Sequence, residues 1–267
     1  MIATSPACTS RRSAAREAPA RRTAARLGGL LLALGCAAVA FSNQAYAQVI
    51  VLKSNAKGVK AGTMLEAAAK VSIPSGASVV VVLPSGAMRT IAGPYDGTAA
   101  GLAKGSKSNP DVFAAVQRYI VTGGSSQNRV GAVRSLAVAA SRPIPFSWAS
   151  VPLHAAGDFC IKKGARPNIV RSRITRAETA TIVDMHSKRR VQISFAKGQD
   201  SIPWPADLDI DPRVTYTVVT PGPVTREVRM RIIEPLPARE DTLQVLHGQR
   251  CSSQFRAYLR ELQNSSN

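Results

Sequence analysis

The chain has 267 residues, and its 35 Lys and Arg against 16 Asp and Glu give a formal net charge of +19. This length allows one large domain or two small ones. The longest apolar run, Leu27–Ala40, is shorter than the ~20 residues that a membrane span needs, and no later stretch is as apolar, so a chain with several spans is excluded.

The N-terminal residues 1–47 have the three parts of a secretory signal peptide. Six arginines form a basic region, Leu27–Ala40 is the apolar region, and Ala45-Tyr46-Ala47 is a cleavage motif. We therefore predict cleavage after Ala47 and a periplasmic or secreted protein without a transmembrane span. An uncleaved membrane anchor is the alternative, for which the apolar run is short.

The mature protein keeps a strong positive charge. Without residues 1–47 it has 29 basic and 15 acidic residues, a net charge near +14. Such a charge attracts anionic partners. In an exported protein these are an envelope protein or an anionic envelope component, such as lipopolysaccharide, phospholipid head groups or acidic glycans, and we expect no nucleic acid. The alternative is a generally basic protein with no anionic ligand.

Two Pro-Ser-Gly turns organise the first module, residues 48–97. Pro74-Ser75-Gly76 and Pro84-Ser85-Gly86 lie ten residues apart. Proline sets one turn dihedral and glycine allows a positive φ, so each triplet is typical of a strand-reversing turn. The turns predict a meander of three short strands, preceded by a strand at Val49–Leu52 and closed by a turn at Pro94–Gly97. The three strands are Ala69–Ile73, Ser78–Leu83 and Met88–Ala92.

Four short motifs follow one another in a characteristic order in this module. They are V-K-A-G-x-x-L at Val59–Leu65, I-P-S-G-A at Ile73–Ala77, L-P-S-G at Leu83–Gly86 and I-A-G-P-Y at Ile91–Tyr95. This order resembles the FecR-like β domain of bacterial envelope proteins over about fifty residues. The resemblance implies a small β meander or roll that serves as a periplasmic interaction module. It also implies an association with signalling to a membrane partner, and no catalytic residues.

Residues 98–145 are predicted to be a linker that contains one amphipathic helix. Thr98–Asn109 is small, polar and basic, which is typical of flexible chain. Asn109 as N-cap and Pro110 at the first position predict a helix over about 110–122. Its apolar face can dock within the chain, the commoner outcome, or on a partner. The face consists of Val112, Phe113, Val116, Tyr119 and Ile120.

The second module, residues 146–263, has several short strand candidates with frequent turns. This pattern predicts an immunoglobulin-like β-sandwich with Trp204 and Tyr216 in its core. A helical segment over Arg239–Gln263, broken at Gly248, follows the strands, and residues 264–267 form a tail. The whole chain is therefore predicted to be mainly β. The strand candidates are Gly157–Ile161, Pro167–Ile174, Thr179–Met185, Arg190–Ala196, Val214–Val219 and Thr225–Glu234.

Two cysteines, Cys160 and Cys251, remain after the predicted cleavage. An even number of cysteines in an oxidising compartment indicates a disulfide. This bond would link the terminal helix to the sandwich.

No pattern for catalysis, a cofactor or a metal is present. The three histidines, His154, His186 and His247, are scattered and form no metal motif. The acidic run Asp207–Asp211 lacks the Gly and Glu of a calcium loop and is better explained as an acidic turn. No G-x-S-x-G motif occurs. We therefore expect a protein that is not an enzyme.

Arginines at alternate strand positions are the strongest candidates for binding. Alternate residues share one face of a strand, so Arg171 and Arg173 form one pair and Arg229 and Arg231 another. If the pairs lie on one sheet, they make a continuous cationic face for phosphate or carboxylate groups. The alternative is that they only keep the outer strand faces in water. The candidate residues are Arg171, Arg173, Lys188, Arg189, Arg190, Arg229 and Arg231.

These observations favour a non-catalytic, secreted envelope protein that binds a macromolecular partner in an interaction or signalling accessory role. The first alternative is a protein that binds an anionic envelope glycan or lipid through its basic strand faces. The second is a cell-wall hydrolase, which the absence of a catalytic motif disfavours.

Overall fold

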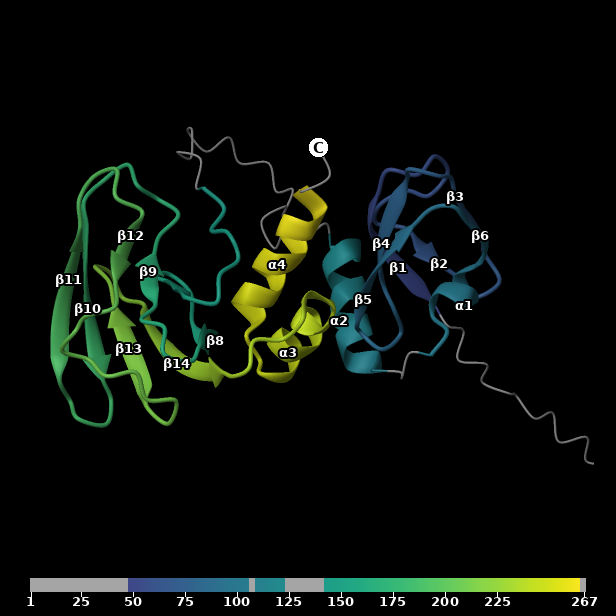
Figure 1. The fold of residues 1–267 in the computed structure, drawn as a ribbon. Helices are drawn as coiled ribbons and strands as arrows, with labels where there is room; N and C mark the ends of the chain where they lie inside the picture. Colours follow the sequence, from purple (N-terminus) through teal and green to yellow (C-terminus); the bar gives the residue numbers. More distant parts are fainter. Residues whose placement is uncertain (1–47, 106–108, 123–141, 265–267) are drawn as a thin grey trace, which may run out of the picture. The chain divides into compact units, whose positions relative to one another are not determined.

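Strands form most of the regular structure, as predicted, and they make four sheets in the described part of the chain. The computed structural model describes residues 48–105, 109–122 and 142–264, all within one unit of the fold (Figure 1). The predicted signal peptide, 1–47, lies outside these residues. Within them, no helix is long and apolar enough to cross a membrane.

The N-terminal module has two small sheets with a shared core. Its elements are β1 (Val49–Ser54), β2 (Met64–Leu65), β3 (Lys70–Ile73), β4 (Ser78–Val82), β5 (Met88–Ala92), β6 (Tyr95–Thr98) and α1 (Ala99–Leu102). One sheet has the order β2-β1-β4-β5, and the other consists of β3 and β6. Val71 and Ile73 of the smaller sheet and Val79 and Val81 of the larger one are buried in the same cluster.

The predicted three-stranded meander is wrong, although both Pro-Ser-Gly turns form. The turn at Pro84–Gly86 joins β4 to its neighbour β5, and Gly86 there has a φ of 79°. The turn at Pro74–Gly76 instead leads from one sheet to the other, since β3 pairs with β6. The place beside β4 belongs to β1, because Val49–Leu52 is apolar on both faces and is fully buried only in the interior of a sheet.

The module also extends further along the chain than predicted. The segment predicted as a closing turn, Pro94–Gly97, lies largely in β6. The hydroxyl of Thr98 accepts a hydrogen bond from the Gly101 N–H and so begins α1, in place of the expected flexible linker. Ala99 and Leu102 of α1 are buried in the core. An alanine-rich segment has the composition of a linker, but alanine also favours helix and packs closely.

The C-terminal module encloses its core between two sheets. Its strands are β7 (Ser150–Pro152), β8 (Gly157–Lys162), β9 (Asn168–Val170), β10 (Glu178–Asp184), β11 (Arg190–Phe195), β12 (Ser201–Pro203), β13 (Thr215–Val219) and β14 (Thr225–Ile233). The sheet orders are β11-β10-β13-β14-β8 and β12-β9-β7. Trp204 and Tyr216 are buried in the core, as predicted, and their rings meet edge to face at 5.1 Å. The immunoglobulin-like topology stays a prediction.

The predicted strand over Pro167–Ile174 is much shorter in the structure. Only Asn168–Val170 pairs with the two neighbouring strands, and at Arg171 the side chain turns into the protein. The strands β7 and β12 were not predicted, because each has three residues and contains a proline.

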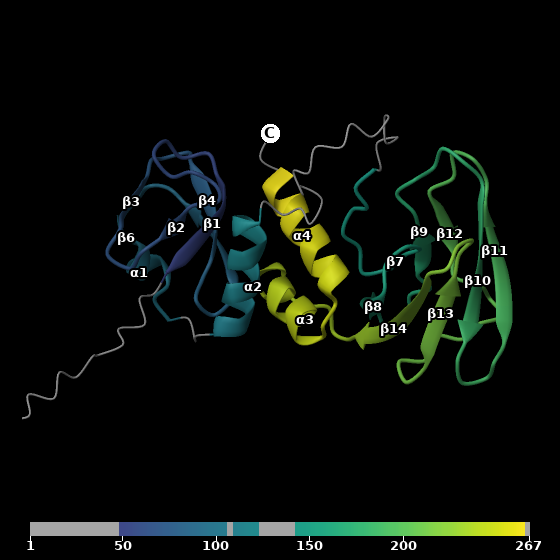
Figure 2. The ribbon, with the colours of Figure 1, turned by 180° about the vertical axis from the view of Figure 1, so that it is seen from behind.

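Three helices lie between strands of the two modules. They are α2 (Pro110–Val121), α3 (Thr242–Gly248) and α4 (Ser252–Asn264), and a short 3₁₀ turn, η1 (Arg239–Asp241), precedes α3. Asn109 caps α2 by accepting a hydrogen bond from the Val112 N–H, as predicted. Figures 1 and 2 show α3 next to both α2 and α4, in agreement with their contacts.

The predicted disulfide is confirmed: Cys160 of β8 is bonded to Cys251, which directly precedes α4. The terminal helix packs on β8, as expected, and also on β1 of the N-terminal module. One buried cluster accordingly contains Ile50, both cysteines and Leu259. The helices thus join the cores of the two modules.

Candidate functional site

The predicted continuous cationic face is wrong. Arg229 and Arg231 belong to β14 of the five-stranded sheet, whereas Arg171 directly follows β9 of the three-stranded sheet. The side chain of Arg171 is only 1% exposed, so it offers no outer surface. Arg171 and Arg173 do line one pocket together, apart from the other pair. The two arginine pairs therefore have separate environments.

Arg229 and Arg231 share a carboxylate of the protein itself. Asp158 of β8 lies opposite Arg229 in the parallel register of the two strands. Its Oδ1 accepts hydrogen bonds from Arg229 at 2.9 Å and from Arg231 at 3.0 Å, and the carboxylate is 5% exposed. The hydrogen bond between Arg229 and Asp158, together with the negative charge of the carboxylate, raises the pKa of Arg229. This arginine pair is partly neutralised within the fold.

The basic turn contains Lys188 and Arg189, between β10 and β11, and Arg190, the first residue of β11. All three residues are exposed, and Arg189 donates a hydrogen bond to the backbone oxygen of Asp207 at 2.6 Å. Lys188 has a φ of 60° and shapes the turn. This turn is at the opposite end of the hairpin from Glu178 and Phe195, which face each other where β10 begins.

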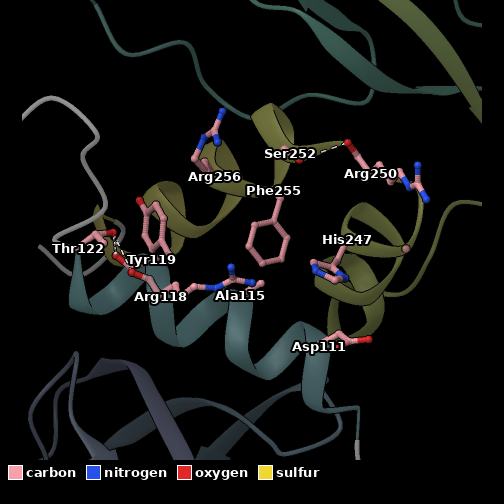
Figure 3. Close-up of a pocket in the computed structure, with 11 residues that line it drawn as sticks. Asp111, Ala115, Arg118, Tyr119, Thr122, His247, Arg250, Ser252, Phe255 and Arg256 are labelled. Carbon is pink, nitrogen blue, oxygen red and sulfur yellow. Dashed lines mark hydrogen bonds between the residues drawn. The ribbon is translucent and has the colours of Figure 1, made fainter.

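A cavity with an apolar floor lies between α2, α3 and α4, and we call it the helical groove. It has a volume of about 860 Å³. Figure 3 shows its side chains projecting from all three helices. The lining residues are Asp111, Ala115, Arg118, Tyr119, Thr122, His247, Gly248, Arg250, Ser252, Phe255 and Arg256.

Two aromatic rings form the floor of the helical groove. Tyr119 of α2 and Phe255 of α4 are 7% and 6% exposed, and both belong to the core cluster that joins the modules. The ring of His247 lies 5.9 Å from that of Phe255. In Figure 3 the Phe255 ring lies between the side chains of Tyr119 and His247. The floor therefore offers an apolar contact to a ligand.

Three arginines form the rim of this floor. Arg118 lies on α2, Arg250 at the α3–α4 corner and Arg256 on α4, and all three are exposed. Within the described residues, none of their guanidinium groups has a carboxylate within 4 Å, in contrast to Arg229. Asp111 is the one acidic residue of the lining. The helical groove therefore combines an apolar floor with a net positive rim.

The hydroxyl of Tyr119 stays protonated at neutral pH. Burial raises its pKa above 10.0, and this outweighs the lowering by the charge and hydrogen bond of Arg260. A neutral phenol at the groove can donate a hydrogen bond to an acceptor on a ligand.

The α3–α4 corner holds Arg250 in place. Arg250 has a φ of 60°, its N–H bonds to the His247 oxygen, and the next N–H, of Cys251, bonds to the Leu246 oxygen. The disulfide then ties Cys251 to β8. The backbone that carries Arg250 is thus fixed on both sides by covalent and hydrogen bonds.

The sequence did not single out the rim arginines. Both amphipathic helices were predicted, but Arg118 and Arg256 have the ordinary pattern of charges that flank an apolar stripe. One signal could have found them: each is next to an aromatic residue in the sequence, Arg118 to Tyr119 and Arg256 to Phe255. An arginine next to a mostly buried aromatic residue lies at the border of the helix's apolar stripe.

In the described part of the chain, no group of three or more His, Cys, Asp or Glu side chains is arranged to hold a metal ion. Comparisons with protein-family models, with curated proteins and with solved structures found no match.

Proposed function

We propose that this protein is a non-catalytic, exported binding protein that holds an acidic segment of a partner protein in the helical groove. The observation that carries the proposal is the rim of three arginines, which have no carboxylate partner among the described residues, around a floor of two aromatic rings. A carboxylate of the partner would take the place that Asp158 takes at Arg229. An apolar side chain of the same segment would cover Phe255.

The apolar floor favours a protein segment over a bare polysaccharide. Interfaces gain most from aromatic and arginine side chains near their centre, and both kinds are present here. A volume of about 860 Å³ accommodates a few side chains of a peptide. The groove is lined by the helices that join the two modules, so a partner bound there would contact α2, α3 and α4.

Export is supported by the predicted signal peptide and by the disulfide. Disulfides persist in oxidising compartments such as the periplasm, and Cys160 is bonded to Cys251. The resemblance of residues 48–97 to FecR-like domains supports an interaction role in the envelope. Binding of an anionic glycan or lipid is the second candidate, favoured by the separate pocket around Arg171.

Site-specific crosslinking tests this proposal. A photoreactive phenylalanine analogue in place of the exposed Ser252 lies at the groove without removing a rim charge. In the envelope fraction we expect adducts with one protein, through a peptide that is rich in Asp and Glu. The triple variant Arg118→Gln, Arg250→Asn, Arg256→Gln should lower the adduct yield at least tenfold. Asn suits the left-handed conformation of residue 250.

A control variant removes the same charge elsewhere. Lys188→Asn, Arg190→Gln and Lys197→Gln change three exposed cations of the C-terminal module that do not line the groove. Its adduct yield should stay within a factor of two of the parent. Equal losses in both variants would point to unspecific charge attraction. Adducts with lipopolysaccharide or peptidoglycan alone would also overturn the proposal.

A further inference from the structure

A second cavity, which we call the arginine pocket, lies in the C-terminal module and does not share a residue with the helical groove. Its volume is about 650 Å³. Four arginines line it together with one carboxylate, one imidazole and several hydroxyl groups. The charged or titratable residues are Arg171, Arg173, Arg176, Arg226, Glu178 and His154.

Arg171 is a rigid, buried part of this pocket. Its Nε donates to the Gln199 oxygen at 2.8 Å, and its two terminal nitrogens donate to the oxygens of Arg176 at 2.8 Å and Ala196 at 2.6 Å. The guanidinium also lies 4.8 Å from the centre of the Phe195 ring. A charge this deeply buried is held in one geometry by the loops around it.

Glu178 is already used by the protein. Its Oε2 lies 3.5 Å from the Arg171 guanidinium, and its Oε1 lies 3.1 Å from Nε2 of His154. The single carboxylate of the pocket therefore balances the buried Arg171. The Glu178 carboxylate does not pair with the other three arginines of the pocket, Arg173, Arg176 and Arg226.

Arg226 is oriented by three hydrogen bonds, one of them from Nη1 to the Val224 oxygen at 3.4 Å, and its Nη2 has no partner among the described residues. Its Nε donates to the His154 oxygen at 3.0 Å and its Nη1 to the Thr220 hydroxyl at 3.1 Å. Arg173 and Arg176 are exposed. Neither of them, nor Arg226, has a carboxylate within 4 Å among the described residues. Three guanidinium groups thus border one pocket with donors available to a ligand.

We infer that the arginine pocket binds a phosphate group. Arginine forks bind phosphate oxygens in pairs, and a tetrahedral oxyanion can accept from several forks in different directions at once. A phosphate also carries more negative charge than a carboxylate. It therefore suits a pocket in which three arginines are unpaired and the one carboxylate, Glu178, is already paired with Arg171. The phosphate could belong to a phospholipid head group or to a phosphorylated glycan. This site is independent of the proposed groove function.

Titration of the purified protein with inorganic phosphate tests the inference. The Nε–H resonances of arginine in NMR spectra should shift on addition of phosphate, with Arg226 among those that move. The double variant Arg173→Gln, Arg176→Gln should raise the dissociation constant at least tenfold. Both side chains are exposed, so the variant should keep the thermal midpoint of the parent.

A matched double variant, Lys188→Asn and Arg190→Gln, removes two charges from the far end of the β10–β11 hairpin. We expect less than a twofold change in its phosphate affinity. The inference fails if phosphate moves no arginine resonance, or if the two double variants lose affinity equally.

The source of the phosphate is distinguished by competition between two simple esters. Glycerol 1-phosphate represents a lipid head group, and glucosamine 1-phosphate represents a phosphorylated glycan. Tighter binding of one ester than of inorganic phosphate supports the site and identifies the source. If neither ester displaces inorganic phosphate, the pocket holds the free ion only, and the assignment to a phosphate of a lipid or glycan is overturned.

Discussion

Replacing Gln254 by leucine should detach the terminal helix from the edge of a sheet. β8 is an edge strand of the five-stranded sheet, and the buried amide of Gln254 bonds to its backbone as a neighbouring strand would. The Oε1 atom accepts from the Cys160 N–H at 2.6 Å. The Nε2 atom donates to the Cys160 oxygen at 2.8 Å and to the Ser147 oxygen at 2.7 Å.

The expected cost follows from the groups that lose their partners. Leucine has nearly the volume of glutamine but cannot form hydrogen bonds, and Gln254 is 3% exposed, so water cannot replace the amide there. A buried polar group without a partner costs ~1–3 kcal/mol. Two such groups belong to the fully buried Cys160, whereas Ser147 is partly exposed and can bind water. With some return from the added apolar surface, we expect a loss of about 2–4 kcal/mol.

Urea unfolding with the disulfide intact measures this loss. Gln244→Leu is the matched control, because the Gln244 side chain of α3 donates a hydrogen bond of the same kind, from Nε2 to the Ser85 oxygen at 2.9 Å. Its expected cost is about 1 kcal/mol. If Gln254→Leu lowers the free energy of unfolding no more than this control, the amide does not complete the sheet edge as described.

Three further predictions concern stability and ionisation. Arg171→Met leaves three backbone oxygens and a carboxylate without their donor, so urea unfolding should show a loss of about 3–5 kcal/mol, and a loss below 1 kcal/mol would contradict the buried network. Hydrogen bonds from Arg213 lower the pKa of Asp211 to about 2, so the stabilisation from this pair is complete above the ordinary value of 3.8 and is lost as the pH falls through 2. A carbon NMR titration should show this low pKa and a rise in Arg213→Gln towards the ordinary value, short of it because the backbone N–H of residue 213 still donates to Asp211, and an unchanged value in the variant would refute the assigned cause. The double variant Cys160→Ala, Cys251→Ala frees residues 91 positions apart and should lose up to about 4–5 kcal/mol on the chain-entropy model. Reduction of the parent protein should shift the urea midpoint equally, and no shift would show that the bond adds nothing.

The sequence was a reliable guide where a local signal decided the structure. The cap of Asn109 with Pro110 placed α2 correctly, and alternating apolar residues located β10, β11 and β14. Strand pairing was less accessible, because each turn shows where the chain reverses but not which strand becomes the neighbour. The partner of β3 is decided by burial of β1 between β2 and β4, which is a long-range effect.

The candidate site was harder to predict for the same reason. Alternation correctly showed that Arg229 and Arg231 share a face, as their common bond to Asp158 demonstrates. It could not show that Asp158 would be opposite, since β8 and β14 are far apart in sequence. For Arg171 the alternation of residues wrongly predicted an outer strand face. The strand ends at Val170, so the rule that alternate residues share a face no longer applies at Arg171.

The pairing of each arginine separates those that serve the fold from those that are available to a ligand. Arg171 and Arg229 show that this chain can supply a carboxylate where a guanidinium must be neutralised. Around the helical groove, the described residues supply none to Arg118. Like charges beside an apolar floor repel one another, and an anionic ligand removes that repulsion. A bound partner is therefore stabilised both by burial of its apolar side chain against Phe255 and by reduced repulsion among the rim arginines. For this reason we place the binding function at the groove and not at the strand arginines.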